Sequence, residues 1–162
     1  MSKSTPYSPD ATDLRILQLL QKNSAITQKE LAAQTHISPA TALRRIERLR
    51  QQGIIEREVA ILNPEHLGHY LQVIAEVTLD RQDTSAQDAF ETMVNTVDAV
   101  QQCYRVNAGP DFILIITVTD IQAYQQLARA IFSPQHNIRN IRAFFCSQRS
   151  KFTTEIPLPP NI

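Results

Sequence analysis

The spacing of apolar residues changes near residue 63 and divides the 162-residue chain into two parts. Before that point, apolar side chains recur every three or four positions, as on one face of a helix. From Leu71 to Leu79 they alternate with other residues, as in a half-buried strand. The turn-like stretch Asn63-Pro64-Glu65-His66-Leu67-Gly68 separates the two patterns. We therefore expect two small domains, residues 1–62 and 71–162, with a linker at 63–70.

The first part predicts two helices before residue 37. A leucine stripe indicates a first helix that begins near Asp10 or Thr12 and ends at Asn23-Ser24. Thr27 and Glu30 have the spacing of a capping box, in which each side chain bonds the other residue's backbone N–H. They indicate a short second helix.

A third, basic helix points to DNA. Ser38 is a good N-cap, Pro39 suits the first helical position, and Gly53 is placed to end the helix before an extended segment that includes Val59–Leu62. A short capped helix, a brief turn and a basic helix form a helix-turn-helix. A solvated face paired with Glu47 is the alternative, but that acid cannot neutralise four arginines within seven residues. The candidate DNA contacts are Ser38, Pro39, Thr41, Arg44, Arg45 and Arg48.

Charge and composition exclude several classes of protein. Sixteen Lys and Arg balance sixteen acids, so bulk positive charge does not coat nucleic acid. Residues 1–60 carry nine bases against six acids, and the rest carries seven against ten, which indicates different partners for the two parts. The polar first ten residues and the lack of a long apolar run favour a cytoplasmic protein. Three glycines against nine prolines argue against a glycine-rich phosphate loop, and neither GxGxxG nor GxxxxGK(S/T) is present.

The second part predicts the order βαββαβ, an α+β ferredoxin-like domain. Strands are expected at 71–80, 100–106, 112–118 and 138–146, with helices after Ser85 and Asp120 and a possible fifth strand at 153–158. Ser85 to Asp88 resembles a capping box. Cys103 and Cys146 fall on opposite edge strands, so we expect thiols rather than a disulfide.

The strand at 112–118 is apolar at nearly every position, so both of its faces need cover. Helices cover one face, and packing of the sheet against a second copy of the chain covers the other. We therefore expect a homodimer at least.

Three stretches of the chain resemble the Lrp/AsnC family of feast/famine regulators. ISPATALRRIERL with the following glycine is similar to the family's recognition-helix pattern, (L/I)SxxxxxxRIxxLxxxGxI, and VAILNPEHLG and CYRVNAGPDFIL are also family-like. The resemblance covers about residues 10–158. It implies a winged helix-turn-helix and dimers built through the second domain, often assembled into octamers. It also implies amino-acid effectors bound between dimers, near the turn that joins the second and third strands of that domain.

That turn is the candidate effector site. Its expected residues are Asn107, Ala108, Gly109, Pro110 and Asp111, with Phe144 as an apolar neighbour. The family pattern has glycine where this chain has Ala108, and Pro110 removes a backbone donor. The family's Thr-x-Thr-like pattern is replaced by Ile141-Arg142-Ala143. Asp111 binds a ligand ammonium group or stabilises the turn, and the residues leave both readings open.

The function expected is that of a sequence-specific transcription regulator, without a cofactor or catalytic residues, whose dimer reads two half-sites about one helical turn apart. Two alternatives stay open. One is an enzyme similar to sirohaem decarboxylases, which resemble this family, with Arg105, Arg142 and His136 as candidate residues. The other is an architectural DNA-binding protein without an effector. His66 and His69 have a spacing that can share a metal on a helix, but Leu67-Gly68 between them favours a turn, so no metal is expected.

Overall fold

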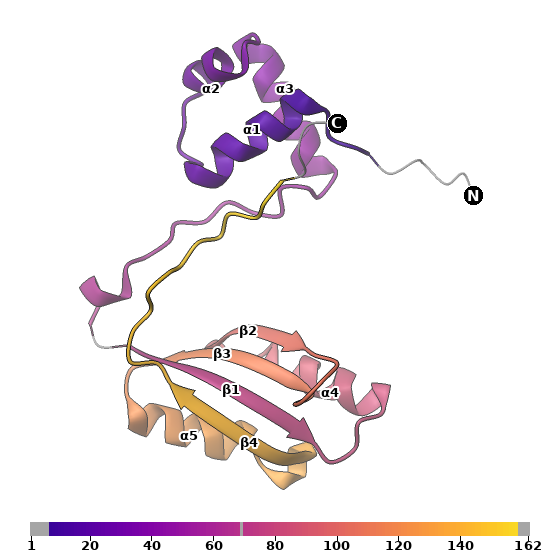
Figure 1. Cartoon of the computed structure of the whole chain (residues 1–162), viewed down its shortest axis with the longest axis vertical. Helices are drawn as coiled ribbons and strands as arrows, with labels where there is room; N and C mark the ends of the chain where they lie inside the picture. The colour runs from indigo at the N-terminus through magenta and orange to yellow at the C-terminus, as the bar shows by residue number, and fades with distance from the viewer. Residues whose placement is uncertain (1–6, 69, 159–162) are drawn as a thin grey trace. The chain divides into compact units, whose positions relative to one another are not determined.

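The structure is a computed structural model that describes residues 7–68 and 70–158 (Figure 1). Its described residues form two compact units. The first contains those up to Ile61 together with those from Lys151 onward, and the second is Leu62–Ser150. The C-terminal tail therefore groups with the helical unit, whereas the sequence analysis placed it in the domain 71–162.

Three helices build the first unit, and local signals set their ends. They are α1 (Ala11–Lys22), α2 (Gln28–Thr35) and α3 (Pro39–Gln51). Thr27 and Ser38 are the N-caps of α2 and α3, as expected from the sequence, and Asp10, near which the first helix was expected to begin, caps α1. His36 takes a left-handed conformation in the turn between α2 and α3, at φ 57°, and Gly53 does so after α3, at φ 70°.

Small side chains let the three helices approach closely. Ala32 and Ala42 are buried beside Ile16, Leu31 and Leu49 in one cluster. Ala42 and Leu49 are fully buried on α3, so the opposite side of that helix is left to solvent. This packing presents the basic face of α3 outward.

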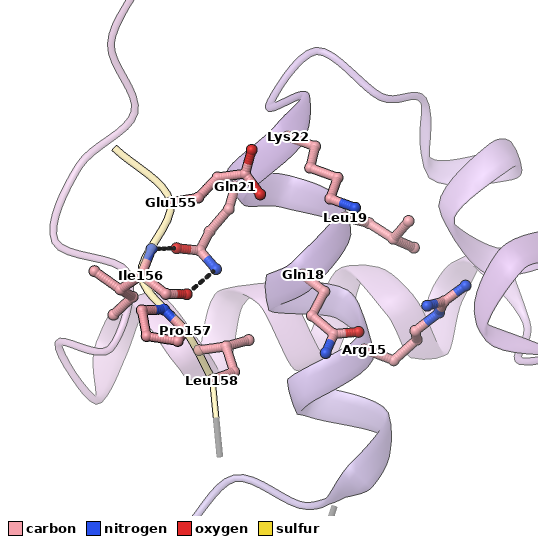
Figure 2. A pocket seen from close by; sticks show the side chains of 9 residues that line it. All are labelled: Arg15, Gln18, Leu19, Gln21, Lys22, Glu155, Ile156, Pro157 and Leu158. Atoms are coloured by element: carbon pink, nitrogen blue, oxygen red, sulfur yellow. Dashed lines mark hydrogen bonds between the residues drawn. The ribbon is translucent and has the colours of Figure 1, made fainter. Parts of the chain in front are cut away.

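The C-terminal tail lies along α1 in an extended conformation. The Ile156 N–H donates to Oε1 of Gln21 at 2.7 Å, and Nε2 of Gln21 donates to the Ile156 carbonyl at 3.2 Å (Figure 2). Leu158 packs against the helical core. A pocket of about 330 Å³ lies between α1 and the tail. Neither the tail nor residues 54–62 form a strand in the described chain, so the fifth strand and the strand after Gly53 are absent there.

The second unit has the expected βαββαβ order. Its strands are β1 (Leu71–Leu79), β2 (Val100–Arg105), β3 (Phe112–Val118) and β4 (Ile138–Phe145), and its helices are α4 (Thr84–Val94) and α5 (Ile121–Ile131). Short 3₁₀ turns occur at Pro64–His66 and Pro134–His136. The strands form one antiparallel sheet in the order β2-β3-β1-β4, so β2 and β4 are the edges.

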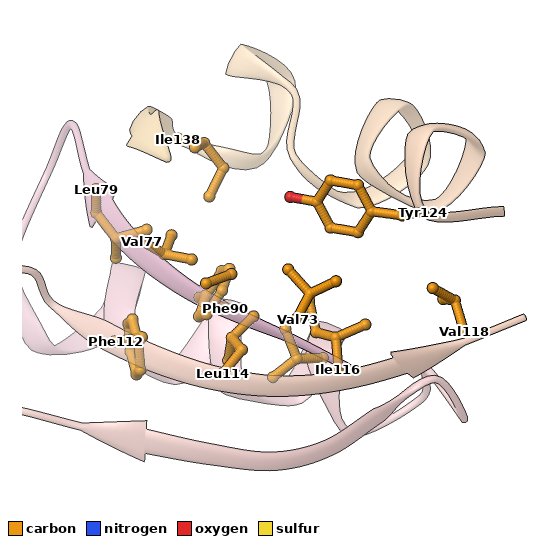
Figure 3. Close-up of a cluster of buried hydrophobic side chains, with 12 residues drawn as sticks. Val73, Val77, Leu79, Phe90, Phe112, Leu114, Ile116, Val118, Tyr124 and Ile138 are labelled. Atoms are coloured by element: carbon orange, nitrogen blue, oxygen red, sulfur yellow. The ribbon is translucent and has the colours of Figure 1, made fainter. Parts of the chain in front are cut away.

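One face of this sheet is covered by α4 and α5 (Figure 1). Alternate residues of β1 and β3, from Val73 and Phe112 onward, form the core with Phe90 and Tyr124 of the helices (Figure 3). Asp83 caps α4 by accepting the Ala86 N–H at 3.0 Å, so the expected cap at Ser85 is wrong by two residues. The Asp83 carboxylate has a lowered pKa because Ser85 and the Ala86 N–H bond its charged form.

The other face of the sheet carries no helix. Ile74, Ile113 and Ile115 are half-buried there, and Tyr104 and Phe144 are 52% and 44% exposed. Adjacent rows cross the sheet, because Ile74 pairs with both Ile115 and Phe144, while Ile113 pairs with Tyr104 and Glu76. We call this side of the sheet, which includes these five apolar residues, the open face. The sequence expectation of a strand buried on both faces holds for only one face in the single chain.

Candidate nucleic-acid interface and effector turn

The N-terminus of α3 presents two hydroxyl groups to solvent. Ser38 Oγ accepts the Thr41 N–H at 3.2 Å and lies 2.8 Å from Thr41 Oγ1. Pro39 occupies the first helical position, where no backbone donor is required. The two hydroxyl groups and the Ala40 N–H, which has no partner among the described residues, favour an anion such as a phosphate.

The arginines of α3 divide into two sets. Arg44 and Arg48 lie on the exposed side, opposite buried Ala42 and Leu49. Neither makes an ion pair in the described part of the chain. Arg50, by contrast, pairs with Glu58 at 2.5 Å. Arg44 and Arg48 therefore have positive charge and hydrogen-bond donors to offer a partner.

Arg45 does not lie with them, although the sequence places it among the DNA contacts. Its Nη1 atom donates to Asp10 Oδ2 at 2.7 Å and to Asp13 Oδ1 at 2.8 Å. Asp13 is 1% exposed, and the Arg45 side chain is 25% exposed. Bonds from Asp10 and then Asp13 raise the pKa of Arg45. Arg45 thus joins α3 to the start of α1.

Tyr7 and two aspartates complete this cluster. The Tyr7 hydroxyl donates to Asp13 Oδ2, and the Arg48 guanidinium carbon lies 4.0 Å from the centre of the Tyr7 ring. Asp10 and Asp13 also form the capping box of α1. Sequence reasoning used Asp10 only as a helix start and missed Tyr7 and Asp13 as partners of α3. The signal available was the Asp10–Asp13 spacing, which predicts a cap but not a contact 32 residues away.

The candidate effector turn joins β2 to β3. The Val106 N–H donates to the Asp111 carbonyl at 3.0 Å and closes the loop, and Gly109 has φ 90°. Asn107, Ala108 and Gly109 are exposed. Within the described chain their backbone N–H groups have no hydrogen-bond partner. Pro110 is half-buried and supplies no donor.

Asp111 stabilises the fold through one of its two oxygens. The Leu79 N–H donates to Oδ2 at 2.8 Å, and Nε2 of Gln82 donates to the same atom at 3.1 Å. Oδ1 has no partner among the described residues, where no fully buried side-chain oxygen is left unpaired. Oδ1 therefore contributes to the exposed surface of Asp111, which is 8% exposed as a residue. The turn-stabilising role is present, and one oxygen is left for a ligand.

Phe144 does not join Asp111 in the single chain. It lies on β4 opposite Ile74, whereas Phe112, next to Asp111, lies on β3 opposite Val77. Their partners on β1, Ile74 and Val77, are three positions apart along the strand. Phe144 belongs to the open face, so the single chain does not bring the expected effector residues together.

The residues named for the enzyme alternative do not converge. Arg105 on β2 pairs with Asp88 and Glu91 of α4 at 2.7 and 2.8 Å. Arg142 on β4 pairs with Glu76 at 3.1 Å, and Nδ1 of His136 lies 3.1 Å from the Ile131 carbonyl. Arg105 lies on the helix side of the sheet and Arg142 on the open face.

The described residues contain neither a disulfide nor a cluster of metal ligands. Burial raises the pKa of the Cys103 thiol to about 11. Cys103 and Cys146 are both free. The described residues contain no group of three or more His, Cys, Asp or Glu suited to a metal. His69, one of the two histidines considered above, lies outside them. No helix in the described ranges is both long and apolar enough to cross a membrane.

Comparison with known proteins covers both units. A model described as winged helix-turn-helix DNA-binding matches residues 9–56, and a model described as Lrp/AsnC ligand binding domain matches residues 72–156. An HTH-type transcriptional regulator of Sinorhizobium fredii is 33% identical over 92% of this chain and 88% of its own length. The leucine-responsive regulatory protein of Escherichia coli is 36% identical over 73% of this chain and 72% of its own.

Among solved structures, a transcriptional regulator from Neisseria meningitidis in complex with L-Met superposes with a TM-score of 0.84. It is 29% identical to this chain, and the match covers 93% of this chain and 97% of that one. Both the family models and the relatives therefore account for the helix-turn-helix and for the sheet domain together. The chain belongs to the Lrp/AsnC family and is a DNA-binding transcriptional regulator with a C-terminal ligand-binding domain.

Proposed function

We propose that this regulator binds a specific DNA site through α3 as a homodimer, and that an amino acid at the turn between β2 and β3 changes that binding. The observation that carries the DNA contact is the exposed side of α3, where Arg44 and Arg48 lie free of ion pairs in the described chain. Such a helix fits the major groove, and a DNA partner also supports the expected cytoplasmic location.

The contacts on α3 have separate tasks in this proposal. Ser38 and Thr41, together with the N-terminal turn that Pro39 begins, hold a phosphate. Arg44 and Arg48 reach base edges or the backbone. Arg45 is left out of the contact set because Asp10 and Asp13 hold it. Two copies of α3 then read two half-sites about one helical turn apart.

Salt dependence and one substitution test the DNA contact. Each neutralised phosphate adds about −0.9 to the slope of log K against log salt, so a dimer is expected to give a slope steeper than about −3. Arg44→Ala weakens specific binding by about 1–3 kcal/mol. Arg129→Ala is the control, because it removes an exposed positive charge of α5 and leaves binding unchanged. A flat salt dependence or an unaffected Arg44→Ala variant contradicts the proposal.

The effector is an amino acid, in line with the L-Met found on the relative from Neisseria meningitidis. Its carboxylate suits the free N–H groups of Asn107, Ala108 and Gly109, and its ammonium group suits Oδ1 of Asp111. Side-chain selectivity comes from apolar neighbours, with Phe144 contributed by another subunit because it lies away from Asp111 in its own.

Melting temperatures in the presence of each amino acid test this part. A ligand that binds the folded protein at 100 times its Kd stabilises it by about 2.7 kcal/mol. Asp111→Asn removes the charge but keeps an acceptor for Leu79, so we expect a folded protein that no longer responds to the ligand. Asp111→Ala leaves the Leu79 N–H unpaired and costs about 1–3 kcal/mol. The absence of any melting shift across the amino acids favours the architectural alternative.

The homodimer forms through the open face, which extends the apolar surface of Ile74, Ile113 and Ile115 to exposed Tyr104 and Phe144. Further assembly into octamers is part of the same expectation. Phe144→Asp places a charge in this face and is expected to give monomers in light scattering. Ile121→Asp is the control, because Ile121 is 39% exposed at the start of α5, outside the open face. A dimer that survives Phe144→Asp uses another surface.

We propose a regulator rather than an enzyme, in keeping with relatives that are transcriptional regulators. The separate positions of Arg105, Arg142 and His136 support this reading. An absorbance spectrum of the purified protein mixed with sirohaem tests the alternative. A stoichiometric shift of the tetrapyrrole bands favours the enzyme, and an unshifted spectrum favours the regulator.

A further inference from the structure

Tyr7 lies between a buried carboxylate and an exposed arginine, and contacts both. Its hydroxyl donates to Oδ2 of Asp13, and its ring faces the Arg48 guanidinium at 4.0 Å. A phenol bonded at its hydroxyl and covered on one face is held in both position and tilt. Tyr7 precedes α1 in the chain, yet it forms a fixed surface beside α3.

Asp13 makes the position of Tyr7 depend on α3. Its Oδ1 atom accepts from Arg45, its Oδ2 atom accepts from Tyr7, and the residue is 1% exposed. Arg45 and Arg48 are three residues apart on α3, about one turn. Arg45 therefore contacts Asp13, Asp13 contacts Tyr7, and Tyr7 contacts Arg48, so this series of contacts begins and ends on α3.

Stacking holds Arg48 without occupying its hydrogen-bond donors. A guanidinium on an aromatic ring uses its flat face, and its N–H groups point outward in the plane. The Arg48 side chain makes no hydrogen bond or ion pair in the parts of the chain that the structure covers. A long side chain that is already held loses less freedom when it binds a ligand. The donors of Arg48 are thus both free and directed.

We propose that Tyr7 is a positioning residue for DNA recognition, which holds the Arg48 guanidinium ready for a phosphate or a base edge. The proposal rests on the DNA contact through α3 proposed above. Tyr7 itself does not contact DNA in this arrangement; it acts through Arg48. Arg44, on the same exposed side, has no such support from the described residues.

A double-mutant cycle in the full-length protein tests the coupling. The DNA is the duplex that the wild-type protein enriches from a randomised library, and the four proteins are wild type, Tyr7→Leu, Arg48→Ala and the double variant. Tyr7→Leu is expected to weaken binding about two- to fivefold in the wild-type background, the size of an exposed cation–π contact. In the Arg48→Ala background it changes affinity by less than about 1.5-fold.

Two further variants separate positioning from folding. Tyr7→Phe keeps the ring and loses the bond to Asp13, so its affinity is expected between those of wild type and Tyr7→Leu. Tyr7→Leu paired with Arg44→Ala is the matched control, and there Tyr7→Leu keeps its full effect. With Tyr7→Leu the melting temperature falls in every background, because the Tyr7–Asp13 bond is lost in each.

The outcomes distinguish this inference from the proposed function. Loss of the Tyr7→Leu effect only when Arg48 is absent supports the positioning role. An equal Tyr7→Leu effect with and without Arg48 overturns it, because Tyr7 then acts through the stability of the unit. Arg48→Ala that weakens binding while Tyr7→Leu does not also overturns it, and leaves the proposed DNA contact standing. A protein that enriches no duplex overturns both.

Discussion

Arg44 and Arg45 are neighbours in the sequence and have different tasks. Arg45 lies between Asp10 and Asp13, whereas Arg44 is exposed and unpaired in the described chain. Arg45→Ala leaves the carboxylate of Asp13 buried without its cation, so it is expected to lower the free energy of unfolding by about 3 kcal/mol. Arg44→Ala is expected to change it by less than about 0.5 kcal/mol. Denaturant unfolding of both variants checks this contrast, and equal losses contradict it.

The same cluster gives the helical unit a dependence on acid. Burial alone raises the pKa of Asp10, but bonds from Arg45 and from the Asp13 N–H outweigh it and leave that pKa below 3.8. A lowered carboxyl pKa gives stability that is complete above the unfolded pKa and is lost as the pH falls through the folded one. The free energy of unfolding, measured from pH 6 to pH 2.5, is therefore expected to decrease once the pH drops below about 4. Arg45→Ala flattens this decline, and an unchanged pH profile in the variant refutes the assignment.

Local signals predicted the elements, because a helix end is decided within four residues of chain. The caps at Thr27 and Ser38, the turn at His36 and the left-handed Gly53 follow from side chains beside them. The contact of the tail with the helical unit was not predicted, because its partner, Gln21, lies 135 residues away. No local pattern encodes that contact. An extended peptide with alternating residues can pair in a sheet or lie along a helix, and its sequence fits both equally well.

For the candidate site, the sequence predicted which residue types are present better than it predicted where their side chains lie. The arginine-rich helix was found from spacing alone, but helical spacing does not say which arginine meets an acid on another helix. Arg45 is the arginine fixed in the recognition-helix pattern, and the structure gives it a packing role. For Asp111 the turn position allowed two readings: the bonds to Oδ2 show the turn-stabilising one, and ligand binding through Oδ1 stays a prediction.

Removal of the C-terminal tail tests whether the tail is attached to α1. A chain that stops at Ser150 loses the paired bonds between Gln21 and Ile156 and the packing of Leu158. The free energy of unfolding of the helical unit is expected to fall by about 1–3 kcal/mol. The sheet unit is expected to keep its stability, because the last buried residue of its core is Ile138, well before the deleted tail. Hydrogen exchange resolves the two units. Faster exchange in α1 alone is the expected result, and uniform exchange counts against a tail attached there.

For the whole molecule, the open face carries a charge pair within an apolar surface. Glu76 and Arg142 lie opposite each other on β1 and β4, 3.1 Å apart, and the row continues through Ile113 to Tyr104. The Arg142 guanidinium also lies 5.4 Å from the centre of the Phe144 ring. In a two-fold dimer the same surface occurs on both subunits, so each of these charges needs an opposite charge on its partner or contact with water.

In the homodimer proposed above, this pair is expected to determine which chains can associate. The double variant Glu76→Arg with Arg142→Glu keeps the pair within a subunit and reverses its polarity. Each protein is expected to dimerise with itself, whereas a mixed dimer sets like charges against each other, which costs several kcal/mol in total. Native mass spectrometry of a tagged wild type mixed with the untagged variant measures the mixed species. We expect it at less than about a tenth of the statistical share, since 1.4 kcal/mol is a factor of ten. If mixed dimers reach their statistical share, Glu76 and Arg142 lie outside the interface. Tagged and untagged wild type are mixed as the control. Free exchange between them shows that slow subunit exchange does not explain a lack of mixed dimers.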